Sequence, residues 1–313
     1  MTEEHITGGE GFYGSYMPPR NVKSLFPPNE TYGSEYVIRT FANWRDPICA
    51  VIPTELNLER SWIEPAEREV PLPAVLSWPP HCDMAYAQFK KAIPSCAPFV
   101  YAVAMTSGNQ NKAPLASRRG TVVVPFYAPN GQTDWKAMAE GLKDLEPPVR
   151  VCLHDHDLKE NRHQFFEGYQ VISPGPVKEK EYLFRLANLF REVRWVASNR
   201  FSSIALYALM GGASYFNYGP APIVDEHNRS EEGLAKEQEL YSMFVKREIA
   251  SVDLHEWAFD VLGGPRFRPP QELHRVLEEC ENMAVERFSH YVRKGFINRL
   301  RLTRREYPRM VMA

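Results

Sequence analysis

The chain has 313 residues and a mass of 36.0 kDa, the size of one large domain or of two smaller ones. Hydrophobic residues make up 44% and charged residues 24% of it, as in soluble globular proteins. The net charge of −2 argues against a dedicated nucleic-acid-binding protein, which carries a basic excess. No apolar run reaches the length of a membrane span, and residues 1–10 contain no apolar signal core. We therefore expect a cytoplasmic protein.

The cysteines are widely spaced and include no Cys-x-x-Cys pair. They are Cys49, Cys82, Cys96, Cys152 and Cys280. Neither a disulfide framework nor a zinc site is indicated by this spacing. Cys96 and Cys152 lie in apolar surroundings, and we predict buried, structural thiols.

The first third of the chain is rich in proline, which interrupts helices. Residues 1–30 carry little periodic signal. Short apolar runs predict strands at residues 47–53, 74–78 and 99–103, with a helix at 84–92. Residues 106–119 (TSGNQNKAPLASRR) are polar and lack apolar periodicity, so they are predicted to be a linker.

A regular alternation of strands and helices follows Gly120. Strands are predicted at 121–125, 149–153, 171–173, 195–198 and 213–218, and helices at 134–145, 158–169, 179–193 and 202–210. This alternation is typical of a parallel α/β sheet. It predicts a doubly wound, Rossmann-like domain over residues 120–220.

The tail begins with a predicted amphipathic helix over residues 271–286. Residues 287–309 then carry eight Lys or Arg against one acid, with aromatic residues interleaved. Two interpretations stay open. The tail lies on the protein with its basic face in solvent, or it is attracted to an anionic surface, a membrane or an acidic polymer.

The first group of candidate site residues lies where the fourth strand of this domain gives way to a helix. It comprises Ser198, Asn199, Arg200, Ser202 and Ser203. In an open α/β sheet, ligands bind outside the carboxyl ends of the strands. A helix N-terminus with hydroxyl and guanidinium donors beside it suits a phosphate. The alternative is that Ser202 only caps the helix.

The second group is His154, Asp155, His156 and Asp157, again where a strand ends. In an extended chain, both imidazoles would point to one side and both carboxylates to the other. The histidines could ligate a metal, but no third ligand is evident in the sequence. We predict that His154, Asp155 and His156 contact a nucleotide or sugar, with no metal, and that Asp157 caps the following helix.

Further candidates follow three other predicted strands. Tyr218 and Glu226 come after the last strand and could hold sugar hydroxyls, although a solvated polar loop explains them equally well. In the first half, Glu55 and His81 each follow a strand and could act as a general base or acid.

No Gly-x-Gly-x-x-Gly follows a predicted strand, and P-loop and Gly-x-Ser-x-Gly motifs are absent. The common dinucleotide oxidoreductases, P-loop NTPases and α/β-hydrolases are therefore disfavoured.

A set of spaced motifs covers roughly residues 75–225: APFVY at 97–101, RGTVVVP at 119–125, VRVCL at 149–153 and YLFR at 182–185, with ASN at 197–199 and YG at 218–219. This pattern resembles the GT-B-type glycosyltransferase-like proteins of bacterial capsule and lipopolysaccharide gene clusters.

The resemblance implies two Rossmann-like domains, with a nucleotide-sugar donor on the second and the acceptor and catalytic base on the first. Ser202 and Ser203 are similar to the phosphate-binding serines of transferases that use CMP-activated acidic sugars. Such proteins tend to carry a Pro-Ser-His-Ser-like run where this chain has PFYA at 125–128, and a His-Gly pair where it has PTE at 53–55. These departures favour donor binding over catalysis.

The expected fold is therefore α/β and GT-B-like, with a shortened first domain (1–110), a nucleotide-sugar-binding domain (120–270) and a C-terminal helical tail (271–313). The expected function is transfer of a sugar from a nucleotide-activated donor to a surface polysaccharide or glycolipid, without a cofactor. Expected partners are the donor and the glycan acceptor, with no nucleic acid. If the basic tail meets a membrane, it does so peripherally at the inner membrane. The alternatives are a metal-dependent hydrolase built on residues 154–157 and an inactive nucleotide- or sugar-binding homologue.

Overall fold

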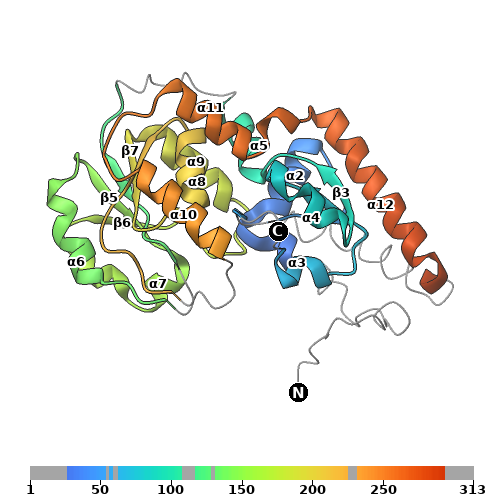
Figure 1. Ribbon diagram of the computed structural model, residues 1–313, viewed down its shortest axis with the longest axis horizontal. Coiled ribbons are helices and arrows are strands. Elements are labelled where there is room, and N and C mark those ends of the chain that lie inside the picture. Colours follow the sequence, from blue (N-terminus) through green and yellow to red (C-terminus); the bar gives the residue numbers. More distant parts are fainter. Residues whose placement is uncertain are drawn as a thin grey trace, which may run out of the picture.

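The structure is a computed structural model, and it describes residues 27–53, 56–58, 63–107, 117–127, 131–224 and 231–292. It contains two α/β units, each built on a parallel sheet (Figure 1). The small sheet has three strands in the order β1-β2-β3, and the large sheet has five in the order β6-β5-β4-β7-β8. The predicted fold class, two Rossmann-like units of which the first is reduced, is confirmed.

The first unit is assembled from short elements because prolines limit their length. Its strands are β1 (Ala50–Val51), β2 (Ala74–Ser77) and β3 (Lys91–Pro94). Its helices are η2 (Pro27–Gly33), α2 (Ser34–Ala42), α3 (Pro65–Glu69), η3 (Pro80–Cys82), α4 (Asp83–Ala87) and α5 (Pro98–Ser107). Every strand pairs in parallel with its sequence neighbour.

The outer edge of β1 is held by a side chain. The amide of Asn29, which is 1% exposed, donates to the carbonyls of Ala50 (2.8 Å) and Ile48 (3.3 Å). Its Oδ1 accepts from the Ile52 N–H at 2.8 Å. Asn29 therefore takes the place that a further strand would fill.

The second unit follows the predicted alternation closely. Its strands are β4 (Thr121–Val123), β5 (Val149–Cys152), β6 (Gln170–Ile172), β7 (Trp195–Ser198) and β8 (Ser214–Asn217). Its helices are α6 (Trp135–Glu140), η5 (Gly141–Asp144), α7 (Asp155–Lys159), η6 (Arg162–Phe166), α8 (Tyr182–Glu192) and α9 (Ser203–Met210). All of its strand pairs are parallel.

Both faces of the large sheet are buried, because its side chains alternate between two apolar clusters. Val122 and Val196 pack with helices α8 and α9 on one face. Their neighbours Val123 and Ala197 pack with α6 and η6 on the other. Helices on both faces are the signature of a doubly wound sheet.

The two units share one hydrophobic core. Helix α5 packs against α8 and α9, and Phe99 stacks on Tyr207 with ring centroids 4.1 Å apart and planes at 13°. The same cluster reaches Ile52 and Leu76 of the first unit. The units are therefore joined by close apolar packing along these helices. The resemblance to GT-B-type proteins also implies a cleft between the two domains, and this cleft stays a prediction.

The chain returns to the first unit at its C-terminal end. Helices α10 (Glu231–Met243), α11 (Val252–Val261) and η7 (Gly264–Arg266) precede the long α12 (Pro270–Val292). Helix α12 runs along the outer side of the first unit (Figure 1), where it packs against α2. Leu273, Leu277 and Cys280 are its buried contacts. Residues 293–313, most of the predicted basic tail, lie outside the described residues.

Several predicted elements are wrong. Residues 99–103 are part of helix α5, since an apolar run that is buried all round has no periodicity to separate helix from strand. The predicted helix at 84–92 is α4 followed by strand β3. The one at 158–169 is divided by Asn161, whose φ of 59° ends α7. Thr106 and Ser107, predicted to be part of a linker, belong to α5, and residues 108–116 of that predicted linker lie outside the described residues.

The cysteine prediction is confirmed for the four cysteines that are buried, all of them free: Cys82, Cys96, Cys152 and Cys280. Cys49 is free and partly exposed. None of the described helices combines the length and the apolar content that a membrane-spanning segment requires.

Candidate functional site

The order of the large sheet reverses at β4. The chain moves outward from β4 through β5 to β6, and then returns to the other side of β4 to form β7 and β8. In doubly wound sheets, the loops that leave the carboxyl ends of the two strands at such a reversal diverge, and ligands bind in the crevice between them. The segment 124–127 follows β4, and the segment 199–202 follows β7.

Asn199 joins the loops at this point. It is fully buried, its Oδ1 accepts from the Phe126 N–H at 2.7 Å, and its Nδ2 donates to the Pro220 carbonyl at 3.1 Å. Both ends of its amide are engaged within the protein. Asn199 therefore positions Phe126 between the two loops, and its predicted contact with a ligand stays a prediction.

Arg200 is held by an acidic partner that the sequence did not indicate. Its Nε and Nη2 lie 2.5 Å and 2.9 Å from the two carboxylate oxygens of Glu237 on α10. Its guanidinium lies over the Phe126 ring, 5.1 Å from the centroid. The predicted phosphate-binding cation is thus at the expected edge, paired with a carboxylate.

Helix α9 begins directly after this arginine. Ser202 is its N-cap, and the Ser202 Oγ accepts from the Ile204 N–H at 3.3 Å. Ser202 therefore caps α9, and its predicted contact with a phosphate stays a prediction. Ser202 and Ser203 are both partly exposed. The positive end of the α9 dipole and the first amides of the helix face the carboxyl edge of the sheet.

A second polar group lies one strand away, after β5. The His154 ring stacks on Tyr127, with centroids 3.8 Å apart and planes at 7°, and the exposed His156 ring is 5.5 Å from the same tyrosine. The predicted extended geometry is wrong, because α7 begins at Asp155. Both imidazoles nevertheless contact one aromatic ring, which follows β4.

The protonation states in this group follow from burial. Burial lowers the pKa of His154 to about 4, so its ring is neutral near pH 7. Its Nδ1 accepts from the His156 N–H at 3.2 Å, which leaves the proton on Nε2. His154, not Asp157, is the N-cap of α7. Asp157 is 7% exposed, and burial raises its pKa. The side-chain atoms His154 Nε2 and Asp157 Oδ2 are buried without a hydrogen-bond partner.

The other predicted residues that the structure describes have contacts of their own. The Tyr218 hydroxyl donates to the Met138 carbonyl at 2.7 Å, on α6. Ser198 is buried inside β7, and Asp155 pairs with Lys159 at 2.6 Å. His81 belongs to the first unit, where its Nε2 lies 2.8 Å from the Asn57 carbonyl. Glu55 and Glu226 lie outside the described residues.

Phe126, Tyr127 and Glu237 are the members of the site that sequence reasoning missed. Phe126 and Tyr127 appeared only as a departure from a family motif, although their position after the central strand could have marked them. Glu237 lies in a helix of mixed charges with no signal of its own.

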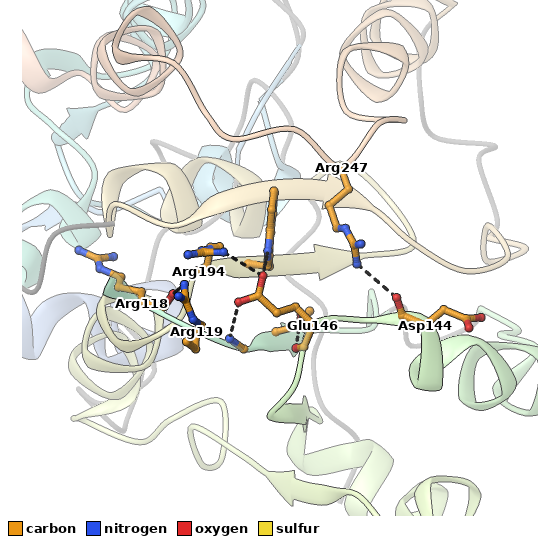
Figure 2. Close-up of polar contacts among 9 residues, drawn as sticks. Arg118, Arg119, Asp144, Glu146, Arg194 and Arg247 are labelled. Carbon is orange, nitrogen blue, oxygen red and sulfur yellow. Dashed lines mark hydrogen bonds and ion pairs between the residues drawn. The ribbon is translucent and has the colours of Figure 1, made fainter. Parts of the chain in front are cut away.

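The opposite, amino edge of the large sheet carries a charged network with a structural role (Figure 2). Glu146 accepts from the Trp195 Nε1–H at 2.9 Å and pairs with Arg194 at 3.2 Å. Burial alone would raise the pKa of Glu146, but hydrogen bonds from Trp195 and Gly120 and the charge of Arg194 lower it overall. Arg247 donates to the Asp144 carbonyl at 3.3 Å. These side chains tie the starts of the strands together.

No group of three or more His, Cys, Asp or Glu is placed to hold a metal ion within the part of the chain that the structure describes. The hydrolase alternative needs such a third ligand beside His154 and His156. It therefore gains no support from these residues.

Comparisons with known proteins give distant structural likenesses. No protein-family profile matches the chain, and no curated protein matches its sequence. A proposed UDP-N-acetylglucosamine 2-epimerase from Listeria monocytogenes is similar at 12% identity and a TM-score of 0.38, covering 73% of this chain and 65% of its own. The chain thus spans less than two thirds of that protein.

Two further structures are similar at the same level. A UDP-GlcNAc 2-epimerase from Neisseria meningitidis, bound to UDP-GlcNAc, has 11% identity and a TM-score of 0.36, covering 76% of this chain and 70% of its own. The glycosyltransferase SnogD from Streptomyces nogalater has 15% identity and a TM-score of 0.32, covering 84% of each chain. We draw no function from likenesses at these scores.

Proposed function

We propose that the protein binds a nucleotide sugar at the carboxyl edge of the large sheet and transfers the sugar to a glycan or glycolipid. One observation carries the proposal. The strand order reverses between β4 and β7, and helix α9 begins at that same place. A crevice at the reversal and a helix N-terminus beside it form the usual site for a nucleotide and its phosphate.

The residues at this edge then have distinct roles. The first turn of α9, with Ser202 and Ser203, binds the phosphate that leaves with the nucleotide and stabilises its growing charge. Tyr127 and His156 offer an aromatic surface to the nucleobase or sugar. The neutral His154 fixes the orientation of Tyr127 through the ring stack. In the first unit, His81 and Glu55 remain the candidates for the base that deprotonates the acceptor hydroxyl.

A second candidate is a protein that binds the nucleotide sugar without turnover. The ion pair between Arg200 and Glu237 favours it, because the cation nearest α9 is already neutralised by a carboxylate. Release of free nucleotide from a bound donor, with and without glycan acceptors, separates a transferase from such a binding protein.

The proposal is tested by thermal unfolding with CMP-, UDP-, GDP- and dTDP-sugars, because a ligand raises the stability of the state that it binds. For a nucleotide that binds, the double substitution Ser202→Ala and Ser203→Ala should weaken binding by about 1–3 kcal/mol per lost hydrogen bond. Ser251→Ala is the matched control. Ser251 also caps a helix, accepting from the Leu254 N–H at 3.2 Å. It lies away from the proposed site, because the adjoining Ala250 N–H donates to Ser214 at the start of β8, which is the opposite edge of the sheet.

Equal affinities of the parent and the double variant for every nucleotide that binds would remove the phosphate site. The remaining terms of the proposal stay predictions: a surface-polysaccharide or lipopolysaccharide acceptor, a cytoplasmic location, peripheral membrane contact through the basic tail, and domain limits at 1–110, 120–270 and 271–313. Helix α12, the first part of the predicted tail, packs on α2 of the first domain.

A further inference from the structure

The pair formed by Arg200 and Glu237 is the most enclosed ion pair beside the proposed site that the described residues show. Their side chains are 11% and 14% exposed. The two N–O distances of 2.5 Å and 2.9 Å describe a fork in which two guanidinium donors meet two carboxylate oxygens. Phe126 covers one face of the guanidinium. Little water reaches this pair, so its charges are weakly screened.

A phosphate would bind Arg200 in the same way as this carboxylate does. Both anions offer two oxygens at the spacing of the guanidinium fork, and both form paired, charge-assisted hydrogen bonds. A phosphate that binds beside α9 and a carboxylate on Glu237 therefore compete for the same two donors. Arg200 has further N–H donors, so a phosphate excludes Glu237 where it takes the edge formed by Nε and Nη2, whose two donors cannot pair with both anions at once.

The helix that carries Glu237 is fixed in the core at its C-terminal end. Leu240 and Phe244 are buried in the core, and the Asn217 Nδ2 donates to the Tyr241 carbonyl at 2.6 Å. In the N-terminal part of α10, Gly233 is buried and Glu231 and Glu232 are exposed. Glu237 lies between the buried Gly233 and Leu240, and a change of its own side-chain rotamer is enough to break the fork with Arg200.

We infer that Glu237 is an internal competitor for the anion site, and that a ligand phosphate displaces it from Arg200. The inference rests on the proposed function for the identity of the ligand, a nucleoside diphosphate or monophosphate. One part of the inference does not depend on which nucleotide binds. The carboxylate of Glu237 on α10 lowers the affinity of this edge for any phosphate. Affinity is therefore set by a residue that contacts the arginine and never the ligand.

The test compares Glu237→Gln with Glu239→Gln, using inorganic pyrophosphate, UDP and CMP as probes in calorimetry. Glu237→Gln keeps the shape of the side chain but removes its charge. We expect the dissociation constant for pyrophosphate to fall at least about tenfold, the effect of one charge-assisted hydrogen-bond partner. Glu239 lies on the same helix in an exposed pair with Lys236 at 2.8 Å. Glu239→Gln makes the same change in net charge and should leave the constant unchanged.

A second measurement uses the unaltered chain. Saturating pyrophosphate should speed hydrogen exchange of the amides at residues 231–238, because binding removes the ion pair that ties that part of α10 to Arg200. Unchanged exchange there, or equal affinities of Glu237→Gln and Glu239→Gln, would overturn the inference. So would failure of pyrophosphate to bind Glu237→Gln.

The outcomes also separate this inference from the proposed function. Tighter pyrophosphate binding by Glu237→Gln without any nucleotide binding would support the competition and reject the nucleotide site. Nucleotides that bind the parent and Glu237→Gln equally would support the site and reject the competition.

Discussion

The two sheets of this protein use polar side chains in different ways. In the large sheet, polar groups gather outside the carboxyl ends of β4, β5 and β7. Among them, Arg200 is partly exposed and His156 is exposed. In the small sheet, the strands follow one another in sequence order without a reversal. There the buried polar groups hold the strands in place. Asn29 bonds β1, and Tyr86 of α4 donates to Glu67 of α3 at 2.6 Å, which joins two helices beside the sheet.

This difference has a physical origin. A five-stranded sheet with helices on both faces buries enough apolar side chains to stabilise itself, so its edge is available for polar groups with other uses. The small sheet contains a strand of two residues and few ladder hydrogen bonds. Side-chain hydrogen bonds supply what its ladder lacks. We therefore expect ligand chemistry in the second unit and sensitivity of folding to polar substitutions in the first.

In this comparison, the two sheets are treated as parts of one cooperative folding unit. Phe99→Ala tests whether the two units unfold together or independently. Phe99 is fully buried between α5 and α9. Its loss should cost about 3–5 kcal/mol of unfolding free energy, measured by urea denaturation. Because the core is shared, a single transition should shift as a whole. Phe165→Ala, at a position 45% exposed, is the control and should change stability by less than about 0.5 kcal/mol. Two separate transitions, with only one of them shifted, would contradict the shared core.

The buried Glu35 of the first unit makes the stability of that unit depend on pH. Burial raises the pKa of Glu35 from its ordinary value of 4.5 to about 7, although Arg39 and the Ile48 amide partly oppose this. In the unfolded chain the group ionises near pH 4.5, and in the folded chain only near pH 7. The free energy of unfolding should therefore fall as pH rises through this window, by about 3 kcal/mol.

Glu35→Gln keeps an acceptor for the Ile48 N–H, which lies 3.2 Å from Glu35 Oε1, and it removes the titration. The difference in unfolding free energy between parent and variant, measured by urea denaturation from pH 4.5 to 7.5, should change in favour of the variant as pH rises. A difference that is constant over this range would show that the carboxyl group is hydrated in the folded state.

The smallest expected effect separates the two roles of Ser202. As the N-cap of α9 it should contribute about 1 kcal/mol to stability, which Ser202→Ala removes and Ser202→Gly largely retains. If Ser202 also binds a phosphate, both substitutions should weaken nucleotide binding alike. Thermal unfolding and calorimetry on the two variants measure these effects. Equal nucleotide affinity of Ser202→Gly and the parent would leave Ser202 with the cap alone.

Most of the alternation of strands and helices after Gly120 could be predicted, because short β-branched runs alternate there with longer segments such as the amphipathic one at 179–193. The stripe of Leu183, Leu186 and Phe190 indicates the amphipathic helix α8, and all three are buried. Helix α5 could not be predicted, because Phe99–Val103 is apolar on every side. The spacing of apolar residues therefore cannot distinguish a helix from a strand there. Strand β3, with an exposed lysine and a proline at its ends, owes its existence to pairing with β2.

The site could be predicted only to the level of its position. Strand ends marked the segments around His154 and Ser202, because a parallel sheet brings its carboxyl ends to one edge. The contacts within the site depend on residues distant in sequence. Glu237 reaches Arg200 from a helix that starts after the sheet is complete, and Tyr127 stacks on His154 from another strand. Such pairings follow from tertiary packing, which local patterns do not encode.

The hydrogen bonds of Asn29 have a consequence for association between molecules. An open strand edge is a template on which another chain can add a strand, and this is a route to aggregation. Here the groups that such a strand would use, the Ala50 carbonyl and the Ile52 N–H, are already bonded to Asn29. An incoming strand must first displace a fully buried amide. One asparagine thus protects the smallest strand of the protein against growth of its sheet into an aggregate.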